Sequence, residues 1–97
     1  MRVEIDEEAF AEAADARDYY SAVSQGLGHE FLVALDRAMN RIIAQPSTWP
    51  TYTERTRRYL MERFPYAVIY NVTENTIRIL AIAHQHRRPG YWTERLP

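Results

Sequence analysis

Apolar residues recur along the chain with two spacings, and the spacing predicts which segments form strands and which form helices. Residues 77–83 (IRILAIA) are β-branched and almost entirely apolar, which is typical of a central strand covered on both faces. Residues 58–63 and 66–72 alternate and predict two more strands, separated by a break at Phe64-Pro65. We expect a three-stranded meander with a hairpin turn at Glu74-Asn75, because Asn tolerates positive φ.

Alternation within these strands predicts which side chains share a face of the sheet. In the last strand, Leu80 and Ile82 are expected on one face, and the other face is expected to carry Ile77, Ile79, Ala81 and Ala83. In the strand before it, Ala67 and Ile69 are expected opposite Val68, Tyr70 and Val72. Both faces of the sheet are therefore predicted to be apolar near its centre.

A short strand and a helix are predicted before the meander. Residues 2–5 alternate as a strand does, and Asp6 is expected to cap a helix that runs to about Ser24. The apolar face of this helix, with Arg17 in it, is expected to contain Phe10, Ala13, Ala14, Tyr20 and Val23. We expect Gly26-Leu27-Gly28 to end the helix, because Gly readily takes the left-handed conformation of a C-cap.

A second helix has the clearest periodicity in the chain. Its apolar residues predict a single face, made of Phe31, Leu32, Leu35, Ala38, Met39, Ile42 and Ile43. Gln45-Pro46 is expected to end this helix. The short connection to the first helix predicts an antiparallel helix hairpin.

The order of the elements predicts an α+β fold. It is β-α-α-β-β-β, with the helix hairpin packed on one face of a small, mainly antiparallel sheet of four strands. Residues 46–56 (PSTWPTYTERT) are expected to form an ordered loop. The second face is then covered either by the loop around Trp49 and the C-terminal tail, or by a partner protein.

Composition bounds the class of protein. The 97 residues are expected to form one domain, residues 1–97, and 46% hydrophobic with 26% charged residues is typical of a soluble globular protein. The absence of cysteine excludes disulfides and thiolate sites. No apolar run approaches the roughly 20 residues of a membrane span, and no signal-peptide core is present. We therefore expect a cytoplasmic protein that does not contact membranes.

The net charge of −1 conceals an asymmetry. Residues 1–40 contain nine acidic residues and three arginines, whereas residues 41–97 contain four acidic residues and nine arginines. All 12 basic residues are Arg, which suits bidentate recognition of carboxylate or phosphate. These arginines either pair with the acidic half of the same chain or bind an anionic partner. Sequence-specific DNA binding is not expected, because no recognition-helix signature is present.

A polar segment follows the apolar strand, and a rigid strand end is a suitable support for a functional surface. His84 and His86 would share a face if the strand continued, and two imidazoles could begin a metal site. Nothing in the sequence places a third ligand, so we expect no metal and no cofactor. Tyr91 and Trp92 are expected either to anchor a partner or to fold back onto the open face of the sheet.

The motifs of the second half resemble those of a known family. Residues 63–70 read RFPYAVIY, and residues 79–92 read ILAIAHQHRRPGYW. With the acidic helix hairpin before them, they resemble the ParE/RelE superfamily of toxins from bacterial type II toxin–antitoxin modules, over essentially the whole chain. The resemblance implies a role such as plasmid stabilisation and a cognate antitoxin whose acidic, apolar C-terminal segment wraps the toxin.

The superfamily has two functional branches: RelE-like members cleave mRNA in the ribosome, and ParE-like members poison DNA gyrase. The nuclease branch places an arginine directly after the tyrosine of the hairpin strand, whereas Tyr66 is followed here by Ala67. That branch also commonly relies on lysines, which this chain lacks. Arg63 is expected to share the face of Ala67, but four strand residues span about 13 Å, too far for a simple replacement. The ending H-x-x-R-x-P-x-YW, residues 84–92, resembles the ParE branch.

We therefore expect a ParE-like inhibitor that binds DNA gyrase and has no catalysis of its own. The candidates for contact with the target are His84, Arg87, Arg88, Tyr91 and Trp92. The candidates for contact with the antitoxin are Arg57, Arg58, Arg63, Tyr19 and Tyr20. The alternative is a RelE-like mRNA interferase that uses His86, Arg87 and Tyr91, with histidine moving the 2′-hydroxyl proton and arginine stabilising the phosphorane.

Overall fold

The computed structural model describes all 97 residues as two helices and a five-stranded sheet. In chain order the elements are β1 (Arg2–Ile5), α1 (Glu7–Val23), α2 (Leu27–Ala44), β2 (Thr51–Thr53), β3 (Thr56–Leu60), β4 (Tyr66–Thr73), β5 (Thr76–His84) and a 3₁₀ turn, η1 (Thr93–Arg95). The strand order is β1-β5-β4-β3-β2, with β1 parallel to β5 and all other pairs antiparallel. The predicted α+β class with a helix hairpin on a mainly antiparallel sheet is confirmed.

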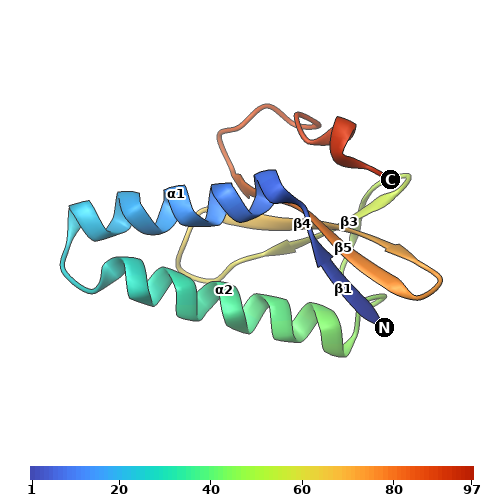
Figure 1. The fold of residues 1–97 in the computed structure, drawn as a ribbon, viewed down its shortest axis with the longest axis horizontal. Coiled ribbons are helices and arrows are strands. Elements are labelled where there is room, and N and C mark those ends of the chain that lie inside the picture. Colours follow the sequence, from blue (N-terminus) through green and yellow to red (C-terminus); the bar gives the residue numbers. More distant parts are fainter.

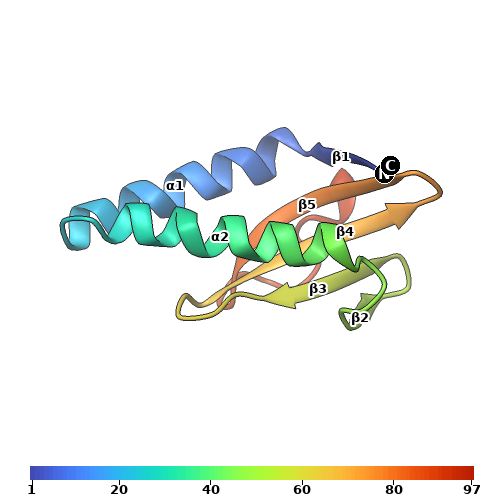
Figure 2. The same ribbon diagram turned by 90° about the horizontal axis from the view of Figure 1, so that it is seen from below.

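Two layers cover the two faces of this sheet. Figures 1 and 2 show α1 and α2 antiparallel and side by side, with their connecting turn projecting beyond the ends of the strands. The C-terminal segment, red in Figure 1, lies across the sheet from α2. We call the side packed against α1 and α2 the helix face and the side packed against residues 91–96 the tail face. No helix is both long enough and apolar enough to cross a membrane.

The sheet has one strand more than predicted. Part of the expected loop forms β2, which pairs with β3. The strand predicted over residues 58–63 is β3, which ends at Leu60 and does not reach Arg63. The backbone of Arg63 has φ of 70°, in the left-handed region. Since Arg63 is not in a strand, the expectation that it shares a strand face with Ala67 is wrong. The predicted turn at 74–75 is confirmed, because Thr73 pairs with Thr76 across it.

A β-bulge in β5 changes the predicted faces of the strand. Tyr70 of β4 pairs with Ile79, and Ile69 pairs with Ala81, so Leu80 has no partner in the register. The extra residue puts Ala81 on the tail face together with Leu80, and it puts Ile82 on the helix face. The predicted faces of Ala81, Ala83 and Ile82 are therefore wrong, because the alternation restarts after the bulge. The predicted alternation in β4 is confirmed.

The first helix packs through its small residues. As predicted, Asp6 is the N-cap, and its carboxylate accepts a hydrogen bond of 2.9 Å from the backbone N–H of Glu8. Two residues of the predicted apolar face are not buried, since Phe10 and Val23 are 68% and 58% exposed. The buried positions are alanines at 9 and 16, because small side chains let α1 lie close to the sheet and to α2.

The glycines between the helices have two separate uses. Gly26 has the predicted left-handed backbone, with φ of 82°, but it is the N-cap of α2 and not the end of α1. Gly28 lies inside α2, where a Cβ would come within 2.0 Å of Ser21 Oγ and 2.6 Å of the carbonyl oxygen of Arg17. Gly28 therefore permits the close approach of the two helices.

The apolar stripe of α2 is only partly buried. Phe31, Ala38 and Ile42 are at most 1% exposed, whereas Leu32 and Ile43 are 36% and 42% exposed. The prediction of a single buried face is thus wrong at its margins, because the stripe is wider than the surface that the sheet and α1 cover. The predicted end of the helix is confirmed, since Ala44 is its last residue.

The C-terminal segment covers the second face of the sheet. Trp92 is 2% exposed and packs in a cluster with Ala67, Ile69, Leu80 and Ala81. Of the two alternatives for Trp92, the structure shows folding back onto the sheet. The segment predicted as the loop around Trp49 contributes as well, because Tyr52 packs against this cluster with its ring 6.2 Å from that of Trp92. Trp49 itself does not, since it packs edge-on against Tyr59 of the helix-face cluster at 4.7 Å.

Candidate functional site

A pocket of about 280 Å³ opens on the tail face, between the ends of the central strands and the C-terminal segment. We call it the tail pocket. It is lined by Tyr52, Arg58, Leu60, Met61, Phe64, Pro65, Tyr66, Ala67, Ile69, Ala83, His84, Gln85, Arg87, Arg88, Pro89, Tyr91 and Trp92. All five residues predicted to contact the target are in this list, so the structure brings them together. No Asp or Glu is among the lining residues.

The chain forms this pocket by turning sharply after β5 and returning across the sheet. The N–H of Arg87 donates to the carbonyl of His84 at 2.9 Å, which closes the turn directly after the strand. Gly90 has φ of 80°, a conformation that favours glycine, and reverses the chain toward Trp92. The end of β5 and the returning segment are thus the two walls of the pocket.

The two histidines interact with each other rather than presenting a metal site. His86 is in the turn after β5, and its backbone N–H donates to Nδ1 of His84 at 3.0 Å. Nδ1 of His84 is therefore a hydrogen-bond acceptor, and the His84 ring lies edge-on to Tyr66 at 5.0 Å. The chain contains no group of three or more His, Cys, Asp or Glu residues arranged to hold a metal ion.

Two guanidinium groups in the pocket lie over tyrosine rings. The Cζ atom of Arg87 is 3.9 Å from the ring centroid of Tyr91, and that of Arg58 is 4.3 Å from the ring centroid of Tyr52. Cation–π contacts of this kind hold the guanidinium plane in place and leave its N–H groups free to donate. Arg58, which was predicted as an antitoxin contact, lines this pocket together with the five target candidates.

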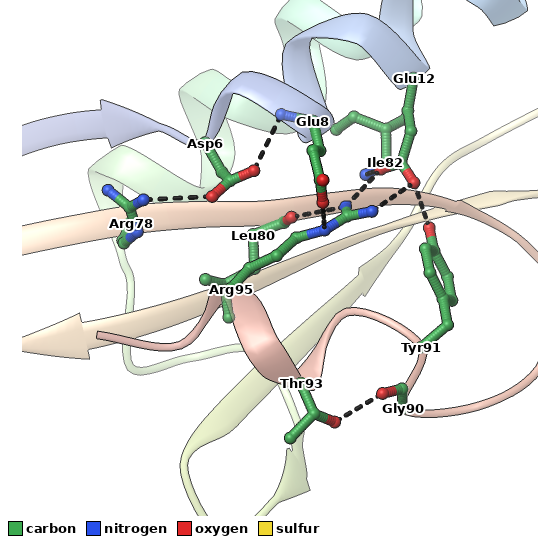
Figure 3. Close-up of polar contacts among 10 residues, drawn as sticks. All are labelled: Asp6, Glu8, Glu12, Arg78, Leu80, Ile82, Gly90, Tyr91, Thr93 and Arg95. Atoms are coloured by element: carbon green, nitrogen blue, oxygen red, sulfur yellow. Dashed lines mark hydrogen bonds and ion pairs between the residues drawn. The ribbon is translucent and has the colours of Figure 1, made fainter.

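A buried polar network fixes the C-terminal segment to α1 (Figure 3). Oε2 of Glu12 accepts a hydrogen bond of 2.7 Å from the hydroxyl of Tyr91. Oε1 accepts from Arg95 at 2.9 Å and from the backbone N–H of Ile82 at 3.0 Å. Arg95 also donates to the carbonyl of Leu80 at 3.0 Å. Where β5 extends beyond the end of β1, its backbone is thus bonded to the side chains of Glu12 and Arg95. We call the side chains of Glu12, Tyr91 and Arg95 the tail latch.

The sequence did not point to Glu12 or Arg95. The two residues are 83 positions apart, and neither belongs to a local motif. The latch also affects Tyr91: burial and the hydrogen bond to the Glu12 carboxylate raise the pKa of Tyr91 well above its usual range. A tyrosine held protonated in this way is a poor general base. Of the alternative nuclease residues, Arg87 and Tyr91 meet in the pocket, but His86 is not in its lining.

The residues predicted to contact the antitoxin do not form one surface. Tyr20 is half-buried, with its ring 4.9 Å from that of Phe64 and 5.1 Å from that of the exposed Tyr19. Arg63, beside Phe64, forms an ion pair of 2.9 Å with Glu30 of α2. These residues lie at the turn end of the helix hairpin. Arg57 is remote from them in β3, where it donates to the carbonyl of Trp49 at 2.6 Å.

A second, apolar hollow of about 310 Å³ lies on the helix side of the molecule. We call it the helix groove; its lining is Ile5, Phe10, Ala13, Ala14, Arg17, Leu32, Leu35, Met39, Ile79 and Ile82. Nine of these ten residues are hydrophobic, and Phe10 and Leu32 are 68% and 36% exposed. In the sequence, the only indication of this groove is the width of the apolar stripe of α2, from which Leu32, Leu35 and Met39 line it.

Comparisons with known proteins agree on one family. The family model described as the ParE toxin of the type II toxin–antitoxin system parDE matches residues 3–89. Among solved structures, one described as the chromosomal ParDE TA system from P. aeruginosa superposes with a TM-score of 0.65 and 21% sequence identity. The match covers 87% of this chain and 95% of that chain, and at this identity it supports the fold alone. No curated protein sequence matches the chain.

Proposed function

The chain belongs to the ParE family of toxins from type II toxin–antitoxin systems, and from that premise we propose that it arrests growth by binding DNA gyrase in the cytoplasm. The tail pocket is the proposed surface for the target. The observation that carries this proposal is that the five target candidates of residues 84–92, four of them polar or charged at neutral pH, line one hollow without any carboxylate. Such a site binds a partner and needs no catalytic group.

We further propose that the helix groove receives the antitoxin of the same system. An apolar groove between two helices suits the apolar face of an amphipathic helix. Ile5, Phe10 and Leu32 border the groove and are exposed. Clustered exposed apolar residues of this kind commonly mark a surface that a partner protein covers. Tyr19 and Arg63, exposed at the turn end of the hairpin, line other hollows than the groove and remain separate candidates for antitoxin contact.

Ribonuclease activity is the alternative function, and one experiment separates it from gyrase inhibition. The chain is induced without antitoxin, and DNA supercoiling and mRNA integrity are followed in the same cultures. We expect loss of supercoiling with intact transcripts, and addition of purified toxin to gyrase should inhibit the enzyme directly. Cleaved transcripts with normal supercoiling would replace the proposal with the interferase.

A further inference from the structure

The arginines of this chain divide into a bonded set and an unbonded set. Six form ion pairs: Arg2, Arg17, Arg41, Arg63, Arg78 and Arg95. Two others, Arg55 and Arg57, donate to backbone carbonyls. The remaining four of the 12 have no bonded partner within the chain: Arg37, Arg58, Arg87 and Arg88. The acidic half of the chain therefore neutralises only part of the basic half.

Three of the four unbonded arginines meet at one place. Arg58, Arg87 and Arg88 all line the tail pocket, whose lining contains no carboxylate. The exception, Arg37, lines a different hollow that also contains Glu30 and Glu62. The tail pocket thus brings together three arginines without a bonded partner in a lining that contains no carboxylate.

We propose that the tail pocket binds an acidic peptide segment of the protein target, with carboxylates held by Arg58 and Arg87. The proposal rests on the assignment of this pocket to the target under the proposed function, and it names the chemistry that the target must present. The two guanidinium groups lie over Tyr52 and Tyr91, which restricts their motion, and their N–H groups have no acceptor within the chain and are available for bidentate bonds to carboxylates.

Two observations favour an acidic peptide over a nucleic acid. The Tyr52 and Tyr91 rings each carry a guanidinium group over the ring, so those faces are not free for stacking with a base. The volume of about 280 Å³ fits a few side chains better than a chain of nucleotides.

Titration of the purified chain with labelled probes tests the inference. The probes are a fluorescein-labelled decapeptide of alternating Glu and Asp, its Gln/Asn counterpart, and a single-stranded RNA decamer, read by fluorescence anisotropy. We expect the acidic peptide to bind more tightly than the neutral one and the RNA, and binding to weaken as salt increases. Arg58→Gln and Arg87→Gln should each weaken peptide binding by about tenfold.

Arg37→Gln is the matched control, because it removes the same charge from another unbonded arginine. It should change peptide binding by less than about twofold, since distant charges are screened. Equal weakening by Arg37→Gln, equal binding of the acidic and neutral peptides, or tighter binding of the RNA would each overturn the inference. Circular dichroism checks that all variants remain folded.

Gyrase is absent from this titration, so the two proposals can fail separately. If the chain does not inhibit gyrase but binds the acidic peptide through Arg58 and Arg87, the target is a different protein with an acidic segment. If it inhibits gyrase and Arg58→Gln with Arg87→Gln leaves the inhibition unchanged, the pocket is not the contact and the inference is overturned.

Discussion

The hydroxyl of Tyr91 donates a hydrogen bond of 2.7 Å to Glu12, and this bond joins the C-terminal segment to the first helix. The same carboxylate forms an ion pair with Arg95, whose side chain is 12% exposed. This segment is one wall of the tail pocket, and of the latch side chains Tyr91 lines the pocket whereas Glu12 and Arg95 do not. Glu12 therefore links the stability of the chain to the shape of the proposed target pocket.

Glu12→Ala should destabilise the chain by about 2–3 kcal/mol, because it leaves several partly buried donors without an acceptor. Urea unfolding followed by circular dichroism measures the change. Glu8→Ala is the control: Glu8 also pairs with Arg95, at 2.7 Å, but its side chain is 69% exposed. We expect the control to cost less than about 1 kcal/mol. Similar losses in both variants would contradict the role of Glu12.

The raised pKa of Tyr91 predicts how stability changes in alkaline solution. In the unfolded chain a tyrosine loses its proton near pH 10, whereas folded Tyr91 keeps it to higher pH. The folded state then binds more protons, so stability is fully present below about pH 10 and falls as the pH rises further. Tyr91→Phe should make this alkaline decline shallower in urea unfolding at a series of pH values. An unchanged slope would contradict the prediction.

Leu32→Asp should prevent neutralisation by the antitoxin while the toxin stays active. A charge in the apolar helix groove has no partner there and opposes the apolar face of a helix. Growth during co-expression with the antitoxin, and co-purification of the two chains, measure the effect. Val33→Asp is the matched control, because Val33 is the adjacent residue and is similarly exposed, 39% against 36%, but lines another hollow. Rescue of both variants by the antitoxin would exclude the groove as its site.

Arg87→Ala should reduce toxicity by about tenfold or more, because it removes a free guanidinium group from the tail pocket. Arg87 is exposed, so unfolding curves should be nearly unchanged. The measurement is the inducer concentration that arrests growth. Arg37→Ala should keep full toxicity, and an Arg87→Ala variant with full toxicity would remove the pocket from the proposed function.

Gly28→Ala should destabilise the chain by about 1–3 kcal/mol, although alanine is the better helix former. The added Cβ would lie 2.0 Å from Ser21 Oγ and 2.6 Å from a backbone carbonyl, so the helices must separate. Adding Ser21→Ala removes the first clash and keeps the second, and we expect it to restore only part of the loss. Thermal and urea unfolding of the three variants test this, and a stabilised Gly28→Ala would show that the helices adjust freely.

Local patterns were sufficient for most of the fold and for one wall of the tail pocket. The periodicity of α2 and the apolar run of β5 depend on neighbours in the chain, and both elements were predicted. The five target candidates were predicted together because all of them lie within residues 84–92, whereas the opposite wall comes from earlier in the chain and was not predicted. Trp92 could not be assigned to a face, since its burial depends on the path of the tail.

The features that the sequence did not reveal depend on contacts between distant segments. The bulge at Leu80 arises from pairing with β4, and no residue of β5 marks it in advance. The exposure of Phe10 follows from the closeness of α1 to its neighbours, which alanine permits but does not require. The tail latch joins residues 79 and 83 positions apart, beyond the reach of any periodicity.

The helix groove and the tail pocket open on opposite faces of one thin sheet. A ligand confined to the groove would leave the pocket accessible, so the two proposed occupants would not compete for space. An antitoxin of that kind could form a ternary complex with toxin and target without relieving the inhibition. Effective neutralisation therefore calls for an antitoxin long enough to pass around the sheet edge, or for a signal carried between the faces by α1 and its bond to Tyr91.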